Sequence, residues 1–378
     1  MKNLLIVIAS QDYLVANHKG LWDEYSNDDE EYVIIVNLPA DFLVSKFRNK
    51  QYRIDESRRG LTKITDKLAV IRLLFILRPE ILPRVFYPLI AKSFWKQLEN
   101  NVNFTKYSRV RLLIYNPLWV KILYNTKKNI DICYYLYDEV RYFAHSQKIN
   151  KKKFRLDKFA CTHSQIVLTM TDRLRNIRLN YTDKIITFGN GASIPHLVTD
   201  PKIKLPNSVA FIGNFRNWIN NDLLEAIIQE CPDRLFVFAG SVENDMRPFF
   251  IKLLNNYTNT VYLGQLSKEK VYTIYKMVSC VIVPYRENLF TSSTRPIKIV
   301  ESVMVGCPVV TIPMSGYKES SFIRFASEKD QFLTAIEEVI ANPIDQESQE
   351  YISFCEENSW KIKARRLKSI LDDIRNED

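Results

Sequence analysis

Runs of apolar residues without polar alternation recur along the chain, and stretches with helical spacing separate them. In the C-terminal half the runs predict strands at 208–212, 235–239, 260–263, 280–284 and 308–312. Helices are predicted at about 221–230, 245–255, 268–277, 297–305 and 329–342. Because strand–helix alternation of this length gives right-handed crossovers, we predict a doubly wound parallel sheet.

The N-terminal half repeats this alternation less regularly. Strands are predicted at 4–10, 32–36, 111–115, 131–136, 166–169 and 184–187, and helices at 18–27, about 61–99 and about 152–161. Pro79, Pro83 and Pro88 interrupt the long helical region, and each should end or kink a helix. This half is therefore predicted to be a second α/β domain.

A polar stretch bracketed by prolines, residues 200–207, is predicted to link the two halves. A length of 378 residues suits two domains. We place the first domain at 1–199, the second at 200–345, and a terminal segment with a basic amphipathic helix at 346–378.

The formal net charge of +10 favours a polyanionic partner. Alternatively, the charge serves only to keep the protein soluble. The basic residues are spread out and form no nucleic-acid-binding module, so nucleic acid is not expected as the partner. The six cysteines contain no Cys-x-x-Cys pair, which is typical of reduced thiols in a cytosolic protein. The apolar run at 4–9 is too short for a signal peptide, and no run is long enough to span a membrane.

The stretch from 284 to 310 carries the clearest chemistry. A predicted strand ends at Pro284, a polar loop follows, and a helix begins with Pro296 in its first turn. Free N–H groups and the helix dipole suit a diphosphate there. Lys298 and Glu301 share a helix face, where they could neutralise phosphate and accept ribose hydroxyls. Alternatively, they form a surface ion pair on an ordinary helix.

This stretch resembles the nucleotide-binding segment of group 1 (GT4-like) glycosyltransferases, whose pattern ends Glu-Ala-x-Ala-x-Gly-x-Pro-Val-Val. Residues 301–310 read Glu-Ser-Val-Met-Val-Gly-Cys-Pro-Val-Val. Further segments resemble family features in the family's order, namely 190–191, 211–215, 235–240, 261–264 and 358–360. The resemblance implies the GT-B architecture, with two Rossmann-like domains facing each other across a cleft and the terminal helix returning toward the first.

The resemblance also implies the residues that bind the donor. They are Gly213, Asn214, Arg216, Leu266, Tyr285, Thr294, Pro296, Lys298 and Glu301. Arg216 could clamp diphosphate oxygens or could simply be solvated. Retaining members carry two glutamates eight positions apart, but Ser293 occupies the first of these positions here. This departure indicates a divergent branch from bacterial polysaccharide assembly, and leaves retention or inversion of the sugar open.

Asp138 and Glu139 follow a predicted strand of the first domain and are the candidates for a catalytic base. An inverting transferase needs such a base to deprotonate the acceptor hydroxyl, and Asp138 is the first choice. Alternatively, the two acids cap a helix. Residues 68–96 mix basic, aromatic and aliphatic side chains, which suits either an interfacial helix on anionic lipid or a core helix pair with a basic face.

We therefore expect a hexosyltransferase that moves a sugar from a UDP-linked donor to a glycan or lipid-linked acceptor. We expect this to serve surface polysaccharide biosynthesis, such as that of lipopolysaccharide, without a metal or other cofactor. The expected location is the cytoplasm, including the inner face of the plasma membrane. The alternatives are an epimerase of GT-B fold, a phosphorylase, for which no pyridoxal phosphate site is evident, and a basic protein that binds nucleic acid.

Overall fold

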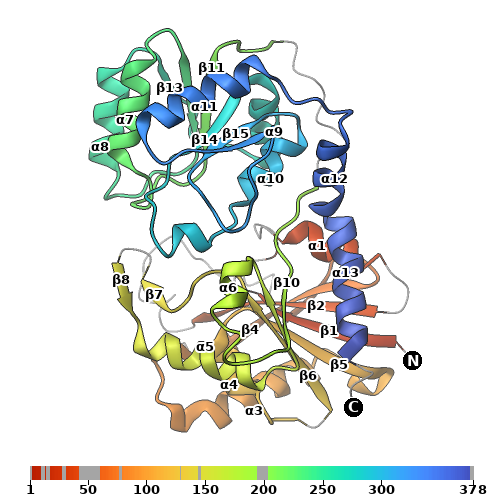
Figure 1. Ribbon diagram of the computed structural model, residues 1–378. Helices are drawn as coiled ribbons and strands as arrows, with labels where there is room; N and C mark the ends of the chain where they lie inside the picture. Colours follow the sequence, from red (N-terminus) through yellow and green to blue (C-terminus); the bar gives the residue numbers. More distant parts are fainter. Residues whose placement is uncertain are drawn as a thin grey trace. The chain divides into compact units, whose positions relative to one another are not determined.

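The computed structural model describes residues 2–9, 13, 18–27, 31–41, 60–75, 79–127, 129–143, 146–193 and 203–374. The chain divides into two compact units, which are described separately (Figure 1). Unit 1 comprises Met1–Arg141, Ile149–Phe188 and Lys363–Asp378, and unit 2 comprises Tyr142–Lys148 and Gly189–Ile362. Unit 2 therefore begins ahead of the predicted linker at 200–207.

Unit 1 is built on a sheet with the strand order β10-β9-β6-β5-β1-β2-β4-β3. Its strands are β1 (Lys2–Ile8), β2 (Glu31–Asp41), β3 (Gly60–Lys63), β4 (Leu68–Phe75), β5 (Tyr107–Ile114), β6 (Ile130–Leu136), β9 (Ile166–Thr169) and β10 (Ile185–Thr187). All neighbours are parallel except β3, which pairs antiparallel with β4. Its helices are α1 (Lys19–Tyr25), α3 (Tyr87–Glu99), α4 (Pro117–Leu123), α5 (Lys151–His163) and α6 (Asp172–Asn176). A separate pair of strands, β7 (Tyr142–Phe143) and β8 (Ser146–Ile149), falls in unit 2 except for its last residue.

The prediction of a helical region over 61–99, interrupted by prolines, is wrong in its first part. That part forms β3 and β4, followed by two 3₁₀ turns (Pro79–Ile81 and Arg84–Phe86) before α3 begins. Along most of β4, fully buried residues alternate with partly exposed ones. This period of two suits a strand in the sheet, and it explains why arginine is tolerated at position 72.

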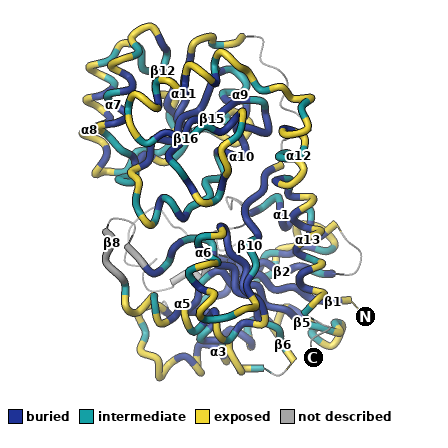
Figure 2. Tube along the Cα trace, viewed as in Figure 1, coloured by how far each residue is buried: buried dark blue, intermediate teal, exposed yellow. Residues whose placement is uncertain are grey.

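Unit 2 contains a fully parallel sheet with the order β13-β12-β11-β14-β15-β16. Its strands are β11 (Ser208–Ile212), β12 (Leu235–Ala239), β13 (Thr260–Tyr262), β14 (Cys280–Val283), β15 (Val309–Thr311) and β16 (Ile323–Phe325). Its helices are α7 (Asn221–Glu230), α8 (Arg247–Asn256), α9 (Lys268–Met277), α10 (Ile297–Met304), α11 (Lys329–Ala341) and α12 (Gln349–Glu357). The predicted doubly wound parallel sheet is confirmed. Its central strands β11, β14 and β15 are buried along their length, whereas β13 and β16 at its two edges are partly exposed (Figure 2).

The last helix, α13 (Trp360–Asp373), starts in unit 2 and continues into unit 1. Within unit 2, Ala192 forms a parallel bridge with Ser359 just before α13. Within unit 1, Asp372 accepts a hydrogen bond of 2.8 Å from the buried Arg111, and Lys363 donates to the carbonyl of Phe188 at 2.7 Å. Residues from both ends of the chain therefore complete unit 1.

Candidate functional site

Three glycine turns line the carboxyl edge of the unit 2 sheet. Gly213, Gly240 and Gly264 follow β11, β12 and β13, and each has a positive φ. Backbone hydrogen bonds of 2.8 Å join Gly213 to Ala239 and Gly240 to Gly264. A Cβ on Gly240 would lie 2.0 Å from the carbonyl oxygen of Gly213. Only glycine fits at position 240, and its absence of a Cβ lets these two turns pack together at the edge where ligands bind in such sheets.

Lys298 projects from α10 toward the first of these turns. Its Nζ lies 4.3 Å from the ring centroid of Phe211 and 5.5 Å from that of Tyr285. A Cβ on Gly213 would lie 2.2 Å from the same Nζ. Among the described residues, no carboxylate pairs with this ammonium group. A cation held against aromatic faces without a counter-ion suits an anionic ligand.

The start of α10 offers further donors. Pro296 occupies the N-cap rather than the first turn where we predicted it, and no side chain caps the helix. The carbonyl of Pro296 accepts a hydrogen bond of 2.6 Å from the Tyr317 hydroxyl, which fixes the helix start. In the first turn the Ile299 N–H donates to the Pro296 carbonyl at 3.2 Å, whereas the N–H groups of Ile297 and Lys298 have no acceptor among the described residues. These two N–H groups and the Lys298 ammonium favour an anion.

Glu301 is 4% exposed and forms its ion pair with Lys268, at the start of α9, rather than with Lys298. The predicted alternative of a Lys298–Glu301 surface pair is therefore wrong. Burial, together with the charge of Glu301, raises the pKa of the neighbouring Tyr272 phenol. Sequence reasoning missed Lys268, although its place after the β13 loop could have indicated it.

Arg216 and Asn214, two further predicted donor residues, already have partners in the protein. Arg216 pairs with Glu243 at 2.7 Å, and its guanidinium lies 5.0 Å from the Trp218 ring centroid. Asn214 accepts a hydrogen bond of 2.7 Å from the Ser241 hydroxyl. Both ends of the Arg216–Glu243 pair are 38% exposed, and such surface pairs are weak enough to exchange for a ligand.

The loop between β14 and α10 is held by its own side chains. Ser293, at the position of the family's first glutamate, is 1% exposed and donates to the Leu289 carbonyl at 2.7 Å. Thr294 donates to the Thr291 carbonyl at 2.7 Å. Tyr285 is buried at the start of this loop, while Leu266, beyond the β13 turn, is half-buried against the unit 2 core.

In unit 1, Asp138 and Glu139 follow β6 but have different surroundings. Glu139 is 2% exposed, and its carboxylate accepts hydrogen bonds from Arg141 at 2.8 Å and Arg178 at 3.0 Å. Burial alone would raise the pKa of Glu139, but the two guanidinium groups bring it below its usual value. Burial and the Glu139 charge raise the pKa of Asp138 to about 6.

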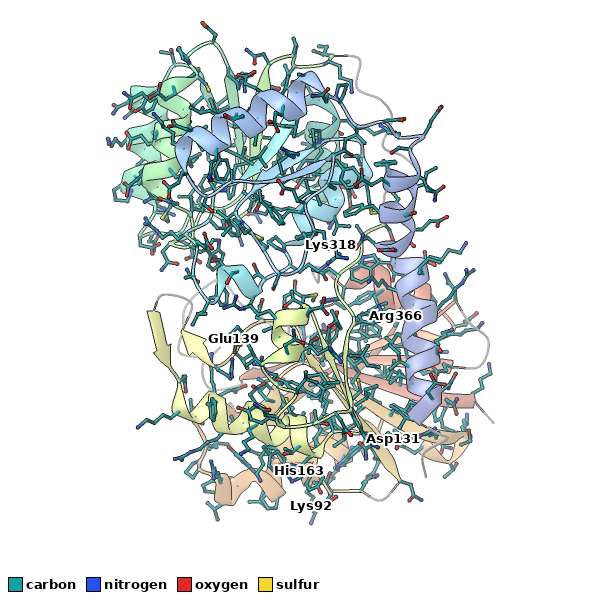
Figure 3. All side chains as sticks on the ribbon, viewed as in Figure 1. Lys92, Asp131, Glu139, His163, Lys318 and Arg366 are labelled. Carbon is teal, nitrogen blue, oxygen red and sulfur yellow. The ribbon has the colours of Figure 1, made fainter. Side chains whose placement is uncertain are left out.

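The Glu139 cluster extends into the core of unit 1. Arg178 also pairs with the buried Asp157 at 2.9 Å, and Asp157 accepts from the Tyr134 hydroxyl at 3.2 Å. Asp131 lies at the start of β6, and Glu139 follows the opposite, carboxyl end of the same strand (Figure 3). Neither acid caps a helix, since Thr171 and Asn150 cap the nearby helices α6 and α5.

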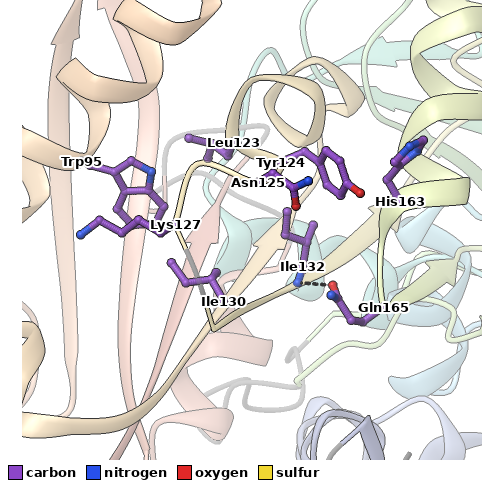
Figure 4. Close-up of a pocket in the computed structure, with 9 residues that line it drawn as sticks. All are labelled: Trp95, Leu123, Tyr124, Asn125, Lys127, Ile130, Ile132, His163 and Gln165. Atoms are coloured by element: carbon purple, nitrogen blue, oxygen red, sulfur yellow. Dashed lines mark hydrogen bonds between the residues drawn. The ribbon is translucent and has the colours of Figure 1, made fainter. Parts of the chain in front are cut away.

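A small cavity of about 40 Å³ lies at the amino end of β6, where Ile130 lines it (Figure 4). His163, on its wall, stacks on Phe159 at 3.8 Å between centroids and hydrogen-bonds the Phe159 carbonyl. In parallel sheets ligands bind at the carboxyl edge, so we assign this cavity a packing role.

Among the described residues, no group of three or more His, Cys, Asp or Glu side chains is arranged to hold a metal ion. No helix in the described part of the chain has the length and apolar character to cross a membrane.

Residues 206–342 match the family model of group 1 glycosyl transferases. No curated protein matches the chain by sequence. Among similar solved structures is sucrose-phosphate synthase from Thermosynechococcus elongatus, with 12% identity, a TM-score of 0.71 and full coverage of both chains.

Two further solved structures are similar over the whole chain. Anabaena HepE, in complex with UDP, has 12% identity and a TM-score of 0.63, and the match covers 99% of this chain and 100% of HepE. UDP-N-acetylglucosamine 2-epimerase from Rickettsia bellii has 12% identity and a TM-score of 0.57, with 100% and 98% covered. At such identities these likenesses establish the fold. The chain therefore has the GT-B fold, and its residues 206–342 match the family model of group 1 glycosyl transferases.

Proposed function

We propose that the protein transfers a hexose from a UDP-linked donor, without a metal ion, to a glycan or lipid-linked acceptor of a surface polysaccharide. The observation that carries the proposal is Lys298, a cation at the carboxyl edge of the unit 2 sheet with no carboxylate partner in the described chain. The UDP bound to HepE, a structural relative, supports the choice of nucleotide.

The geometry suits stabilisation of a diphosphate leaving group. Negative charge builds on the diphosphate as the bond to the sugar breaks. Lys298 lies in the first turn of α10, so its ammonium group and the N-terminus of that helix can both donate to this charge. Glu301, kept in place by Lys268, has carboxylate oxygens suited to ribose hydroxyls. Arg216 becomes available for phosphate once it exchanges its partner Glu243.

Asp138 is the proposed base that accepts the proton of the acceptor hydroxyl. A pKa of about 6 leaves its carboxylate ionised at neutral pH while keeping it basic enough for proton transfer. The oxygens of Glu139 are occupied by Arg141 and Arg178, so we assign Glu139 to holding the turn that carries Asp138.

A thermal-shift screen against UDP, GDP, ADP and CMP tests the donor. Binding to the native state raises the apparent stability, by about 2.7 kcal/mol at a ligand concentration of 100 Kd. We expect UDP to give the largest shift. A larger shift with another nucleotide would overturn the choice of UDP, and no shift with any of the four would overturn the assignment of a nucleotide site.

The epimerase with the same fold provides the competing activity. An epimerase converts its nucleotide sugar without an acceptor. Incubating the protein with UDP-sugars alone and resolving the products by NMR separates the two, since an epimerised UDP-sugar would exclude our proposal.

We also propose that unit 1 associates with the inner face of the plasma membrane. The predicted membrane-facing segment was 68–96, but residues 68–75 form strand β4 in the sheet. We therefore restrict the proposed surface to residues 81–96. Ile81, Val85 and Leu89 are 63%, 76% and 63% exposed. Arg84, Lys92 and Lys96 lie among them in the sequence, and exposed apolar groups beside cations favour an anionic bilayer.

A further inference from the structure

A second cavity in unit 1, of about 340 Å³, lies at the carboxyl ends of β5 and β6. Tyr115 and Asn116 border it directly after β5, and Val140 borders it after β6. The start of α5 and Glu80, in the 3₁₀ turn before α3, complete its polar rim. This is the edge of a parallel sheet at which ligands bind, and Val140 follows Asp138 by two residues.

The polar side chains of the cavity wall offer mostly hydrogen-bond donors. Asn116 and Asn150 cap α4 and α5, and their side-chain oxygens accept from the backbone N–H groups of Leu118 and Lys153, each at 3.0 Å. Their side-chain amide N–H groups have no acceptor among the residues described. A ligand that meets these two side chains must therefore bring the acceptor atoms.

Two lysines add positive charge to the same wall. Lys152 donates from Nζ to the Glu80 carbonyl at 2.9 Å, which joins the rim on α5 to the 3₁₀ turn. Lys153 forms no ion pair within the described chain. Both stand in the first turn of the thirteen-residue α5, where the helix dipole also favours an anion. The Glu80 carboxylate is the opposing charge.

The apolar residues of the lining are Pro117, Leu118, Val140 and Leu156, and we call these four the apolar wall. Leu118 and Leu156 are 2% and 9% exposed, so these residues also belong to the core of unit 1. The cavity lining therefore offers cationic groups for an anion and apolar surface for hydrocarbon.

We propose that this cavity binds the acceptor through a phosphate or diphosphate group joined to an apolar chain. The phosphate oxygens accept from Lys152, Lys153 and the two asparagine amides, and the chain lies on the apolar wall. The inference rests on the proposed function and specifies its acceptor class as a lipid phosphate or diphosphate that carries the accepting sugar.

Titration calorimetry with geranyl diphosphate, inorganic pyrophosphate and geraniol, each without nucleotide, tests the site. We expect geranyl diphosphate to bind at least about tenfold more tightly than either half alone, because it uses both walls. Equal affinity for pyrophosphate and geranyl diphosphate would overturn the apolar part of the proposal. No binding of geranyl diphosphate would overturn the whole.

Charge variants locate the binding. Lys152→Glu with Lys153→Glu should weaken geranyl diphosphate binding at least tenfold, and Glu80→Gln should strengthen it severalfold. Lys158→Glu, on the same helix but outside the cavity wall, is the matched control and should bind as the wild type does. Unchanged affinity in the double variant, with wild-type circular dichroism, would sink the assignment.

A separate measurement keeps this proposal distinct from the proposed function. The UDP-induced thermal shift should be unaffected in the Lys152→Glu, Lys153→Glu double variant, because those lysines belong to unit 1 and the donor residues to unit 2. Geranyl diphosphate binding without any nucleotide shift would defeat the proposed donor while leaving the cavity as an amphiphile site. A nucleotide shift without geranyl diphosphate binding would do the reverse.

Discussion

At the scale of single residues, surroundings decide which charged groups remain available to a ligand. Glu139 is the second candidate, after Asp138, for the catalytic base, yet two arginines occupy its carboxylate. Lys298 has aromatic rings in place of a counter-ion. The sequence places Asp138, Glu139 and Lys298 at strand or helix ends. It does not reveal the partners of Glu139 or Lys298, because residues such as Arg178 and Phe211 are distant along the chain.

Replacing Lys298 by alanine should lower turnover by about 10²–10³-fold, since a donor to the developing diphosphate charge is lost. Steady-state kinetics with saturating acceptor measures the effect. Lys270→Ala, an exposed lysine on α9, is the control and should keep wild-type turnover. Unaltered kinetics in Lys298→Ala would remove this lysine from the donor site.

Asp138 makes the activity and the stability depend on pH in opposite directions. Its carboxyl has a raised pKa of about 6 in the folded protein against 3.8 ordinarily. The folded state therefore binds this proton more tightly than the unfolded chain does. The resulting stability is present below pH 3.8 and is lost as the pH rises through about 6.

Asp138→Asn should consequently abolish turnover and stabilise the fold at pH 8 by up to about 3 kcal/mol, with no gain at pH 3.5. In the wild type, kcat/KM should rise with pH through about 6. Urea unfolding at the two pH values and a pH–rate profile measure both effects. A variant that is inactive but no more stable than the wild type at pH 8 would contradict the raised pKa.

At the scale of elements, most strands of both units were predictable, and the main error is the helix predicted over 61–75, which forms β3 and β4. The strands of unit 2 are short apolar runs bounded by glycine, proline or polar caps, so their limits are clear in the sequence. Strand β4 was assigned to a helix because its arginine-bearing, leucine-rich run suits either period. Only its pairing with β2, which lies earlier in the chain, and with the neighbouring β3 settles the assignment.

The glycine turns give a prediction at this scale. Gly240→Ala should weaken UDP binding at least about tenfold, because its Cβ would displace the Gly213 backbone. Gly264→Ala is the matched control. A Cβ there meets no atom within 4 Å, so we expect only the cost of a positive φ, about 1–2 kcal/mol of stability. Calorimetric titration with UDP distinguishes them, and equal affinities would contradict the role of the Gly213–Gly240 contact.

At the scale of the whole molecule, the net charge of +10 would attract the protein to the anionic membrane that we propose as its location. Long-range attraction to anionic lipid acts on the entire chain, while the exposed apolar groups of 81–89 act only on contact. Charge was evident from composition alone. The apolar contact surface was not, because its residues resemble core residues until the fold shows which face they occupy.

Vesicle sedimentation tests this division of roles. We expect binding to vesicles of phosphatidylcholine with phosphatidylglycerol, weaker binding in 0.5 M salt, and little binding to phosphatidylcholine alone. Val85→Asp with Leu89→Asp should reduce binding severalfold at low salt, whereas Ile251→Asp, an exposed apolar site on α8 of unit 2, should not. Equal loss in both variants would refute a specific surface.

The junction of Arg111 with Asp372 also bears on how the chain is synthesised. Arg111 is 1% exposed, and its two carboxylate partners are Glu31 and Asp372. A ribosome delivers Asp372 only after all of unit 2 has emerged, so the first unit to be translated is the last to be completed. An isolated piece that ends at Phe188 leaves Arg111 with one of its two partners. Preparations of the isolated first unit should therefore include α13, either fused to that unit or added as a separate peptide.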